Sequence, residues 1–169
     1  MVEINTRYKI GTRRFGLINW IGAYTLYKKE VLRFLIVWIQ TIFSPLISSL
    51  LFLMVLSLAI GNDRGEVLGV SFINFLAPGL IAMQVIQQSF SHSSSSFMIG
   101  KIQGNIVDVL YAPLSPSEVT LAVSFAAVTR SFLIAIISIL VFYFIVDLEI
   151  KNYFLLIVFT FLSSFILGS

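Results

Sequence analysis

Long stretches without any charged side chain constrain this fold more than any other feature of the sequence. Residues 34–62, 67–100 and 153–169 carry no formal charge, and residues 119–146 carry only Arg130. A helix needs about 20 mostly apolar residues to cross the hydrocarbon core of a bilayer. We therefore predict four membrane-spanning helices, at about residues 34–60, 70–98, 117–146 and 153–169.

The composition excludes a water-soluble domain and several kinds of chemistry. Hydrophobic residues make up 58% of the chain and charged residues only 11%, whereas soluble proteins carry about 25% charged residues. The chain has no cysteine and one histidine, so disulfides, thiolate catalysis and Cys- or His-ligated metal sites are not expected. We predict an all-α protein, a polytopic transmembrane helix bundle with no catalytic, cofactor-binding or metal-binding residues.

Residues 1–33 form a basic arm that precedes the first charge-free stretch. We predict that this arm and the transmembrane domain, residues 34–169, are separate parts of the chain. The apolar and aromatic residues of the arm recur at helical spacing, at Leu17, Trp20, Ile21, Tyr24, Tyr27, Val31 and Phe34. The pattern predicts an amphipathic helix lying in the membrane interface, with its aromatic rings at headgroup depth. The alternative is a soluble helix packed on another subunit. We favour the interfacial helix because it directly abuts a membrane span.

The distribution of basic residues predicts the orientation. With a cytoplasmic N-terminus, the outer turns hold only Arg64 and Lys151, and the inner side holds the nine other basic residues: Arg7, Lys9, Arg13, Arg14, Lys28, Lys29, Arg33, Lys101 and Arg130. Short loops rich in Lys and Arg stay on the cytoplasmic side. We therefore expect a multi-pass protein of the bacterial inner (plasma) membrane with its N-terminus inside. Since the sequence ends while still apolar, we also expect it to be truncated within its fourth span.

The inner segment between the second and third spans contains a short amphipathic helix, predicted at about residues 101–112. Pro113 ends it, because the residue before a proline is pushed out of the helical region. Ser115, Pro116 and Glu118 then form the pattern of a capping box, which starts the third span. Two long helices thus hold the short helix below the membrane. A cytoplasmic partner could grip it as a lever, or it could be a surface helix without a partner; the pattern leaves both open.

Several polar residues in the spans have both a functional and a structural interpretation. Arg130 either extends toward the inner boundary of the membrane or faces a substrate path, and we favour the first. His92 could relay protons, although an interfacial histidine is the commoner case. Candidates for a substrate path are Trp38, Gln40, Gln84 and Gln87. The glutamines could equally bond neighbouring helices, and Trp38 could anchor the interface.

Three stretches together resemble the ABC-2 type export permeases, the membrane subunits of exporters for drugs, lipid-linked polysaccharides and related glycolipids. These stretches are the arm helix, residues 75–81 (FLAPGLI) and residues 104–118, which end in APLSPSE. The resemblance implies six spans, a dimer of permeases, and a coupling helix that docks on a separate ATP-binding subunit. It assigns that contact to Gly104, Ile106, Asp108, Leu110, Tyr111, Pro113 and Glu118.

The pattern G-x-x-x-x-G-K-[ST], which cradles nucleotide phosphates, does not occur in the sequence. We therefore expect no cofactor on this chain, with ATP and Mg²⁺ in the partner ATPase subunit. The other expected partners are a second permease copy and membrane lipid, and no nucleic acid. The alternative hypotheses are a secondary transporter or channel, which predicts buried ionisable residues or paired broken helices, and a membrane enzyme, which predicts a cluster of His, Asp or Glu at one interface.

Overall fold

The structure is a computed structural model that describes residues 18–60, 66–67, 69–146 and 152–169. The first half of the basic arm and most of the two outer turns lie outside these residues. Predictions that concern their charged side chains, including Arg64 and Lys151, therefore also lie outside the described part.

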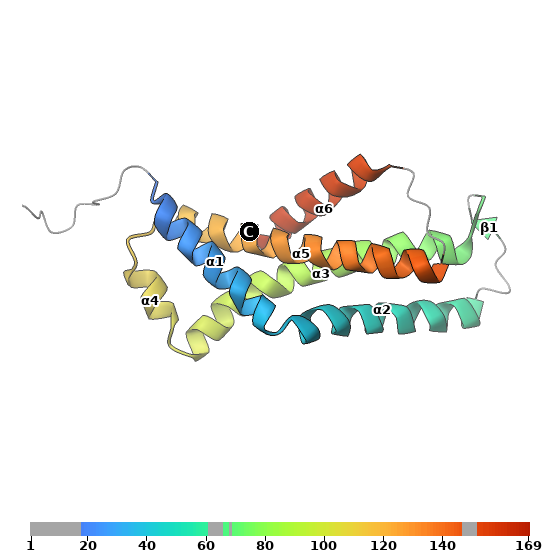
Figure 1. Cartoon of the computed structure of the whole chain (residues 1–169), viewed down its shortest axis with the longest axis horizontal. Coiled ribbons are helices and arrows are strands. Elements are labelled where there is room, and N and C mark those ends of the chain that lie inside the picture. The colour runs from blue at the N-terminus through green and yellow to red at the C-terminus, as the bar shows by residue number, and fades with distance from the viewer. Residues whose placement is uncertain (1–17, 61–65, 68, 147–151) are drawn as a thin grey trace, which may run out of the picture.

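The described part is helical apart from one short hairpin (Figure 1). Its elements in chain order are α1 (Trp20–Ile36), α2 (Trp38–Ile60), β1 (Glu66–Val67), β2 (Val70–Ser71), α3 (Phe72–Ile102), α4 (Ile106–Tyr111), α5 (Pro116–Val146) and α6 (Tyr153–Gly168). Strands β1 and β2 pair antiparallel. The predicted all-α membrane bundle is confirmed.

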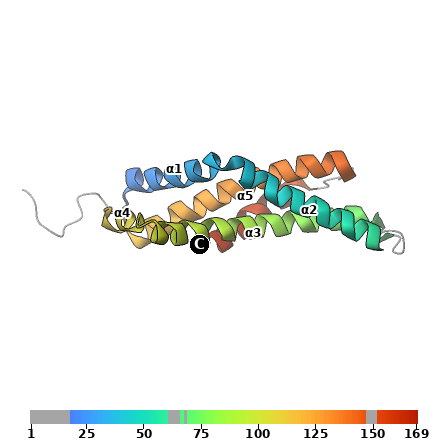
Figure 2. The ribbon, with the colours of Figure 1, turned by 90° about the horizontal axis from the view of Figure 1, so that it is seen from below.

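Helices α3 and α5 form the centre of the bundle, running side by side in both views (Figures 1 and 2). Helix α1 packs on α5, α2 packs on α3, and α6 packs against both central helices. The hairpin and α4 lie at opposite ends of the molecule (Figure 1). Each central helix has 31 residues, or about 46 Å against a hydrocarbon core of about 30 Å. Part of their length must therefore project beyond the membrane.

Two described helices have both the length and the hydropathy of a membrane span, within Trp38–Ala59 and Pro116–Val146. Helix α3 is as long as α5 but carries glutamines and serines in its second half, and α6 is apolar with 16 residues. The first boundary differs from its prediction. Helix α1 continues to Ile36, and Val37 separates it from α2. Phe34 belongs to α1 because it continues the buried stripe of Leu26 and Glu30, spaced four residues apart.

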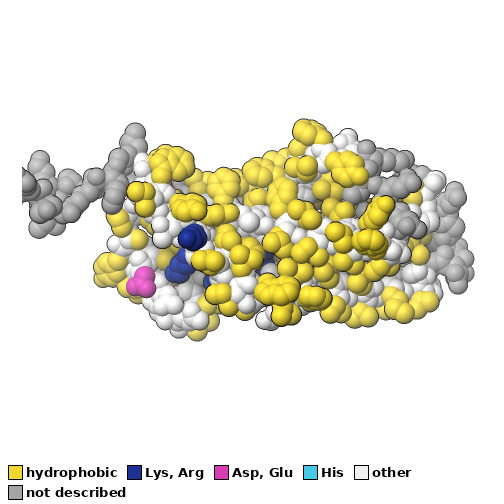
Figure 3. Space-filling view, viewed as in Figure 1, with side chains coloured by type: hydrophobic (Ala, Val, Ile, Leu, Met, Phe, Trp, Pro, Cys, Tyr) yellow, Lys and Arg dark blue, Asp and Glu magenta, His cyan; other side chains and the backbone are white. Residues whose placement is uncertain are grey.

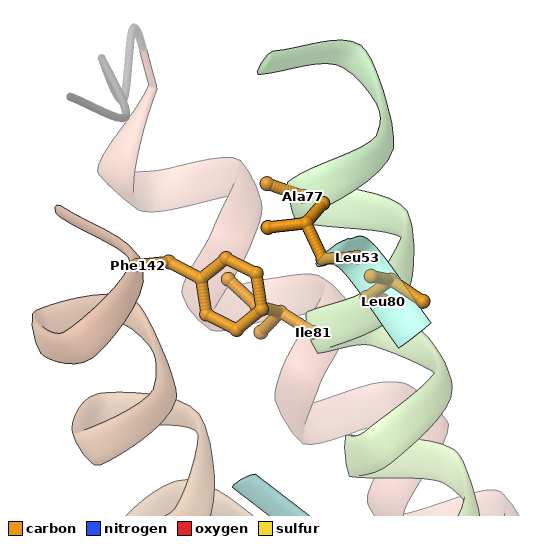
Figure 4. Close-up of a cluster of buried hydrophobic side chains, with 5 residues drawn as sticks. All are labelled: Leu53, Ala77, Leu80, Ile81 and Phe142. Carbon is orange, nitrogen blue, oxygen red and sulfur yellow. The ribbon is translucent and has the colours of Figure 1, made fainter. Parts of the chain in front are cut away.

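The packing is apolar toward the hairpin end and polar in the middle. Leu53, Ala77, Leu80, Ile81 and Phe142 form a buried cluster in which α2, α3 and α5 meet (Figure 4). Helix α6 instead packs through hydroxyl groups. The hydroxyl of Ser89 donates to the carbonyl of Ser164 at 2.6 Å, and that of Ser93 to the carbonyl of Gly168 at 2.7 Å. Small residues and interhelical hydrogen bonds are the usual means of helix association in a membrane.

Candidate functional site

The segment between α3 and α5 contains a shorter helix than the sequence predicts. Helix α4 covers Ile106–Tyr111, whereas one helix was expected over residues 101–112. Lys101 and Ile102 are the last residues of α3, and Gly104 adopts a φ of +75°. That left-handed conformation interrupts a helix and is accessible mainly to glycine. The predicted single apolar face, which joined Ile102 to Ile106, is therefore wrong.

Helix α4 is nevertheless strongly exposed. None of its residues is buried, and Leu110 and Tyr111 are 76% and 86% exposed. The carboxylate of Asp108 lies on the same short helix and is also exposed. Gly104 and Pro113 are exposed at its two sides, and Ile106 is half-buried. Large apolar side chains at a tip that projects from the bundle are typical of a surface that binds a partner.

Glu118 lies inside the structure rather than on this exposed surface. One carboxylate oxygen accepts from the backbone N–H of Ser115 at 2.7 Å, and the hydroxyl of Ser115 accepts from the N–H of Glu118 at 3.4 Å. This reciprocal pair confirms the predicted capping box at the start of α5. The other oxygen accepts from the backbone N–H of Asn19 at 2.7 Å. A single buried carboxylate thus joins the N-terminal ends of α1 and α5.

Further contacts strengthen the same junction. The side-chain amide of Asn19 donates to the carbonyl of Pro113 at 3.3 Å and accepts from the N–H of Gly22 at 3.0 Å. Leu114 packs closely on Gly22, since a Cβ placed on that glycine would lie 2.7 Å from a Leu114 methyl group. We call Asn19, Gly22, Leu114 and Glu118 the α1–α5 latch. The latch connects the arm helix directly to the segment that carries α4.

A groove of about 800 Å³ lies between α2 and α3. Its apolar lining includes Phe52, Met83 and Phe90. Its polar lining residues are Ser44, Ser48, Ser49, Gln84, Gln87, Gln88, Ser91, Ser94 and Ser95. We call it the α2–α3 groove. Mixed apolar and polar linings of this size suit a ligand of moderate size with both kinds of surface.

The structure separates the four candidates for a substrate path. Gln84 and Gln87 both line the groove, whereas Trp38 and Gln40 are exposed at the start of α2 and are not among its lining residues. Gln84 is buried, donates to the carbonyl of Pro45 at 2.9 Å and accepts from the hydroxyl of Ser138 at 2.7 Å. It therefore joins three helices, as the structural interpretation predicted. Gln87 is exposed in the groove.

A cluster of ionisable residues lies where α1, α3 and α5 meet. The guanidinium of Arg33 is 2.9 Å from the carboxylate of Glu30, which is in turn 3.8 Å from the imidazole of His92. His92 is fully buried and packs edge-to-face on Phe34. Arg130 donates to the side-chain oxygen of Gln88 at 2.6 Å. We call Glu30, Arg33, His92 and the half-buried Arg130, which come from α1, α3 and α5, the polar junction.

Sequence patterns did not predict Glu30 as part of a site. The available signal was an acid on the same helical face as Leu26 and Phe34, four residues from each. Basic residues dominate the arm, and its apolar and aromatic residues were expected to face the membrane interface, so no packing of Glu30 inside the bundle was predicted. Trp20 and Tyr24 prove to be exposed, as they would be on a helix that faces lipid.

Among the residues whose side chains the structure describes, charged groups gather toward the α1 and α4 end. In the face seen in Figure 3, the basic and acidic side chains lie over the α1 and α4 end, and the rest of that face is mostly hydrophobic. Lys28, Lys29, Arg33, Lys101 and Asp108 all belong to this end. Within the described part, Lys and Arg are thus concentrated at the α1 and α4 end, which we call the charged end.

Comparisons with known proteins agree with this architecture. A family model described as ABC-2 type transporter matches residues 22–169. The inner membrane transport permease YadH of Escherichia coli strain K12 is 29% identical over 136 residues, which cover 80% of this chain and 53% of that protein. The YadH permeases of Escherichia coli O157:H7 and Shigella flexneri match with the same values. This chain spans about half the length of these curated relatives, and no solved structure matches it significantly.

Proposed function

Because the chain belongs to the ABC-2 type transporter family, we propose that it forms part of the path of an exporter driven by a separate ATP-hydrolysing subunit. In this proposal the chain performs no chemistry itself. ATP and Mg²⁺ bind to the partner subunit, and a second permease copy completes the transmembrane path. The membrane is the bacterial inner membrane, as it is for the relatives named YadH.

The observation that carries the proposal is the exposed tip formed by α4. Leu110 and Tyr111 expose most of their surface at the charged end of the bundle, and in this proposal water rather than lipid surrounds them. Leaving large apolar side chains in water is unfavourable by about 25 cal/mol per Å². A groove on the ATPase that covers them would gain this free energy, and Asp108 beside them would fix the orientation of the contact.

The contacts around α4 support transmission of movement into the membrane. Helix α3 enters the segment and α5 leaves it, and both are continuous over 31 residues. The α1–α5 latch adds the arm helix to this unit. Displacement of α4 on ATP binding would therefore move three helices, a rigid-body change between two states that nucleotide biases.

The proposed substrate is an amphiphile that enters the α2–α3 groove. The groove offers methionine and phenylalanine side chains for an apolar portion, and glutamine and serine side chains for a polar one. With α4 bound to a cytoplasmic ATPase, the charged end faces the cytoplasm and the β1–β2 hairpin faces outward. The groove then extends from the inner boundary toward the middle of the membrane.

The test is ATPase capture by the intact permease. The double variant Asp108→Asn, Leu110→Ala should lose binding of the ATPase and acceleration of ATP hydrolysis, while the amount of folded permease stays unchanged because both side chains are exposed. Leu58→Ala provides a matched control, since Leu58 is an exposed leucine near the C-terminal end of α2, far from α4. Binding and acceleration that persist in the double variant would contradict the assignment of α4 as the docking element.

A further inference from the structure

The polar junction of α1, α3 and α5 contains two arginines and one carboxylate, so one of its positive charges is not neutralised. Arg33 is paired with Glu30 at 2.9 Å. Arg130 donates only to the neutral amide oxygen of Gln88, and its buried Nε has no hydrogen-bond partner. Within the described ranges, no carboxylate forms an ion pair with Arg130. His92 does not supply a negative charge in either of its protonation states.

Arg130 is half-buried and has no carboxylate beside it, which favours an anion as its partner. Arg130 lies 16 residues before the end of α5, or about 24 Å along the helix axis, inside or at the inner boundary of a core about 30 Å thick. A charge that is removed from water without a partner costs several kcal/mol. Ionisable residues in membrane spans are for this reason commonly part of a ligand or ion path.

Both arginines of the junction are connected to the wall of the α2–α3 groove. Arg130 holds the side chain of Gln88, and Arg33 donates to the carbonyl of Ser95 at 3.4 Å. Gln88 and Ser95 are themselves lining residues of the groove. Rotation of the single Gln88 side chain would free Arg130 to face the groove. None of the described lining residues is acidic, so no carboxylate of that wall competes for the Arg130 guanidinium.

We propose that Arg130, assisted by Arg33, binds the anionic headgroup of the amphiphile carried in the α2–α3 groove. This inference rests on the proposed function and specifies its substrate class: a single- or multi-chain amphiphile that ends in a phosphate or carboxylate. A guanidinium binds both groups through two parallel hydrogen bonds. Met83 and Phe90 would contact the apolar chain. A cationic headgroup would be repelled by the unpaired charge.

The experiment uses the intact permease with its ATPase in nanodiscs and three amphiphiles with the same chain: dodecyl phosphate, dodecyl maltoside and dodecyltrimethylammonium. Binding of each is measured by competition with radiolabelled dodecyl phosphate, and ATP hydrolysis is measured in parallel. Dodecyl phosphate should bind at least tenfold more tightly than the other two and should accelerate ATP hydrolysis. Arg130→Gln should remove that preference, whereas Lys29→Gln, an exposed cation on α1, should retain it.

The outcomes separate this inference from the proposed function. If no amphiphile binds or accelerates hydrolysis, the proposed function itself fails. Equal binding of the three headgroups, or a preference that survives Arg130→Gln, overturns the headgroup site alone. Binding of dodecyl phosphate without acceleration also overturns it, because it indicates a resident lipid. If Arg130→Gln does not fold, Arg33→Gln and the headgroup comparison on the unmodified permease provide the same test.

Discussion

Replacement of Glu118 tests the α1–α5 latch most sharply. Its carboxylate is buried and accepts two backbone N–H groups, those of Asn19 and Ser115, each at 2.7 Å. Hydrogen bonds to a charged group contribute about 1.5–3 kcal/mol each, and a buried donor left without a partner carries a further cost. Glu118→Ala should therefore lower the free energy of unfolding by about 3 kcal/mol or more. Glu118→Gln keeps one acceptor oxygen and should lose roughly half as much.

The assay is equilibrium unfolding of the intact permease in mixed micelles, together with ATP-driven transport in proteoliposomes. Asp108→Asn is the matched control for the unfolding measurement, because its carboxylate is exposed. Since the latch ties α1 to the segment that α4 moves, Glu118→Gln should also reduce the transport obtained per ATP hydrolysed. An unfolding free energy that is the same for Glu118→Ala and the unmodified permease would refute the latch.

Four further substitutions test the packing of the bundle and the roles of its two glutamines. Gly168→Val should destabilise the permease by about 1–3 kcal/mol, because a Cβ at Gly168 would lie 3.0 Å from the Cβ of Ala127; an unchanged unfolding curve would exclude this close approach. Phe142→Ala removes a buried ring from the cluster in Figure 4. It should lower the free energy of unfolding by about 2 kcal/mol, which is the contribution of the cavity alone, because lipid solvates the ring as well as the protein core does. A loss below about 0.5 kcal/mol would contradict this packing. Gln84→Leu should lower the unfolding free energy by about 1–3 kcal/mol, because it leaves a buried hydroxyl and a carbonyl without their partner, whereas Gln87→Leu should leave it unchanged and alter transport. The opposite pattern would reverse the roles given to the two glutamines.

The sequence was sufficient to predict the helices whose ends carry local signals. Helix α5 starts at the capping box of Ser115 and Glu118 and covers the predicted residues to within one position. The same reasoning failed at α4. The four-residue spacing of Ile102 and Ile106 predicted one continuous helix, whereas Gly104 between them adopts a positive φ that interrupts it. Periodicity shows which residues share a face, but it does not show where a glycine breaks that face.

The polar contacts between distant segments could not be predicted from the sequence. The resemblance assigned Glu118 to the contact with the ATPase, and nothing in the sequence revealed its bond to Asn19, 99 positions away. The partners of Arg130 and His92 likewise come from other helices, so spacing along one helix gave no information about them. The groove depends on how α2 and α3 are placed together, and the sequence showed only that Gln84 and Gln87 interrupt an apolar helix.

The position of Tyr111 relative to the membrane is the most direct test of the account. The sequence contains no cysteine, so a Tyr111→Cys substitution introduces a single reactive thiol into this part of the permease. In sealed vesicles, a membrane-impermeant maleimide should label it only from the cytoplasmic side, and bound ATPase should protect it. Labelling from the outer side, or equal labelling with and without the ATPase, would contradict the coupling role of α4.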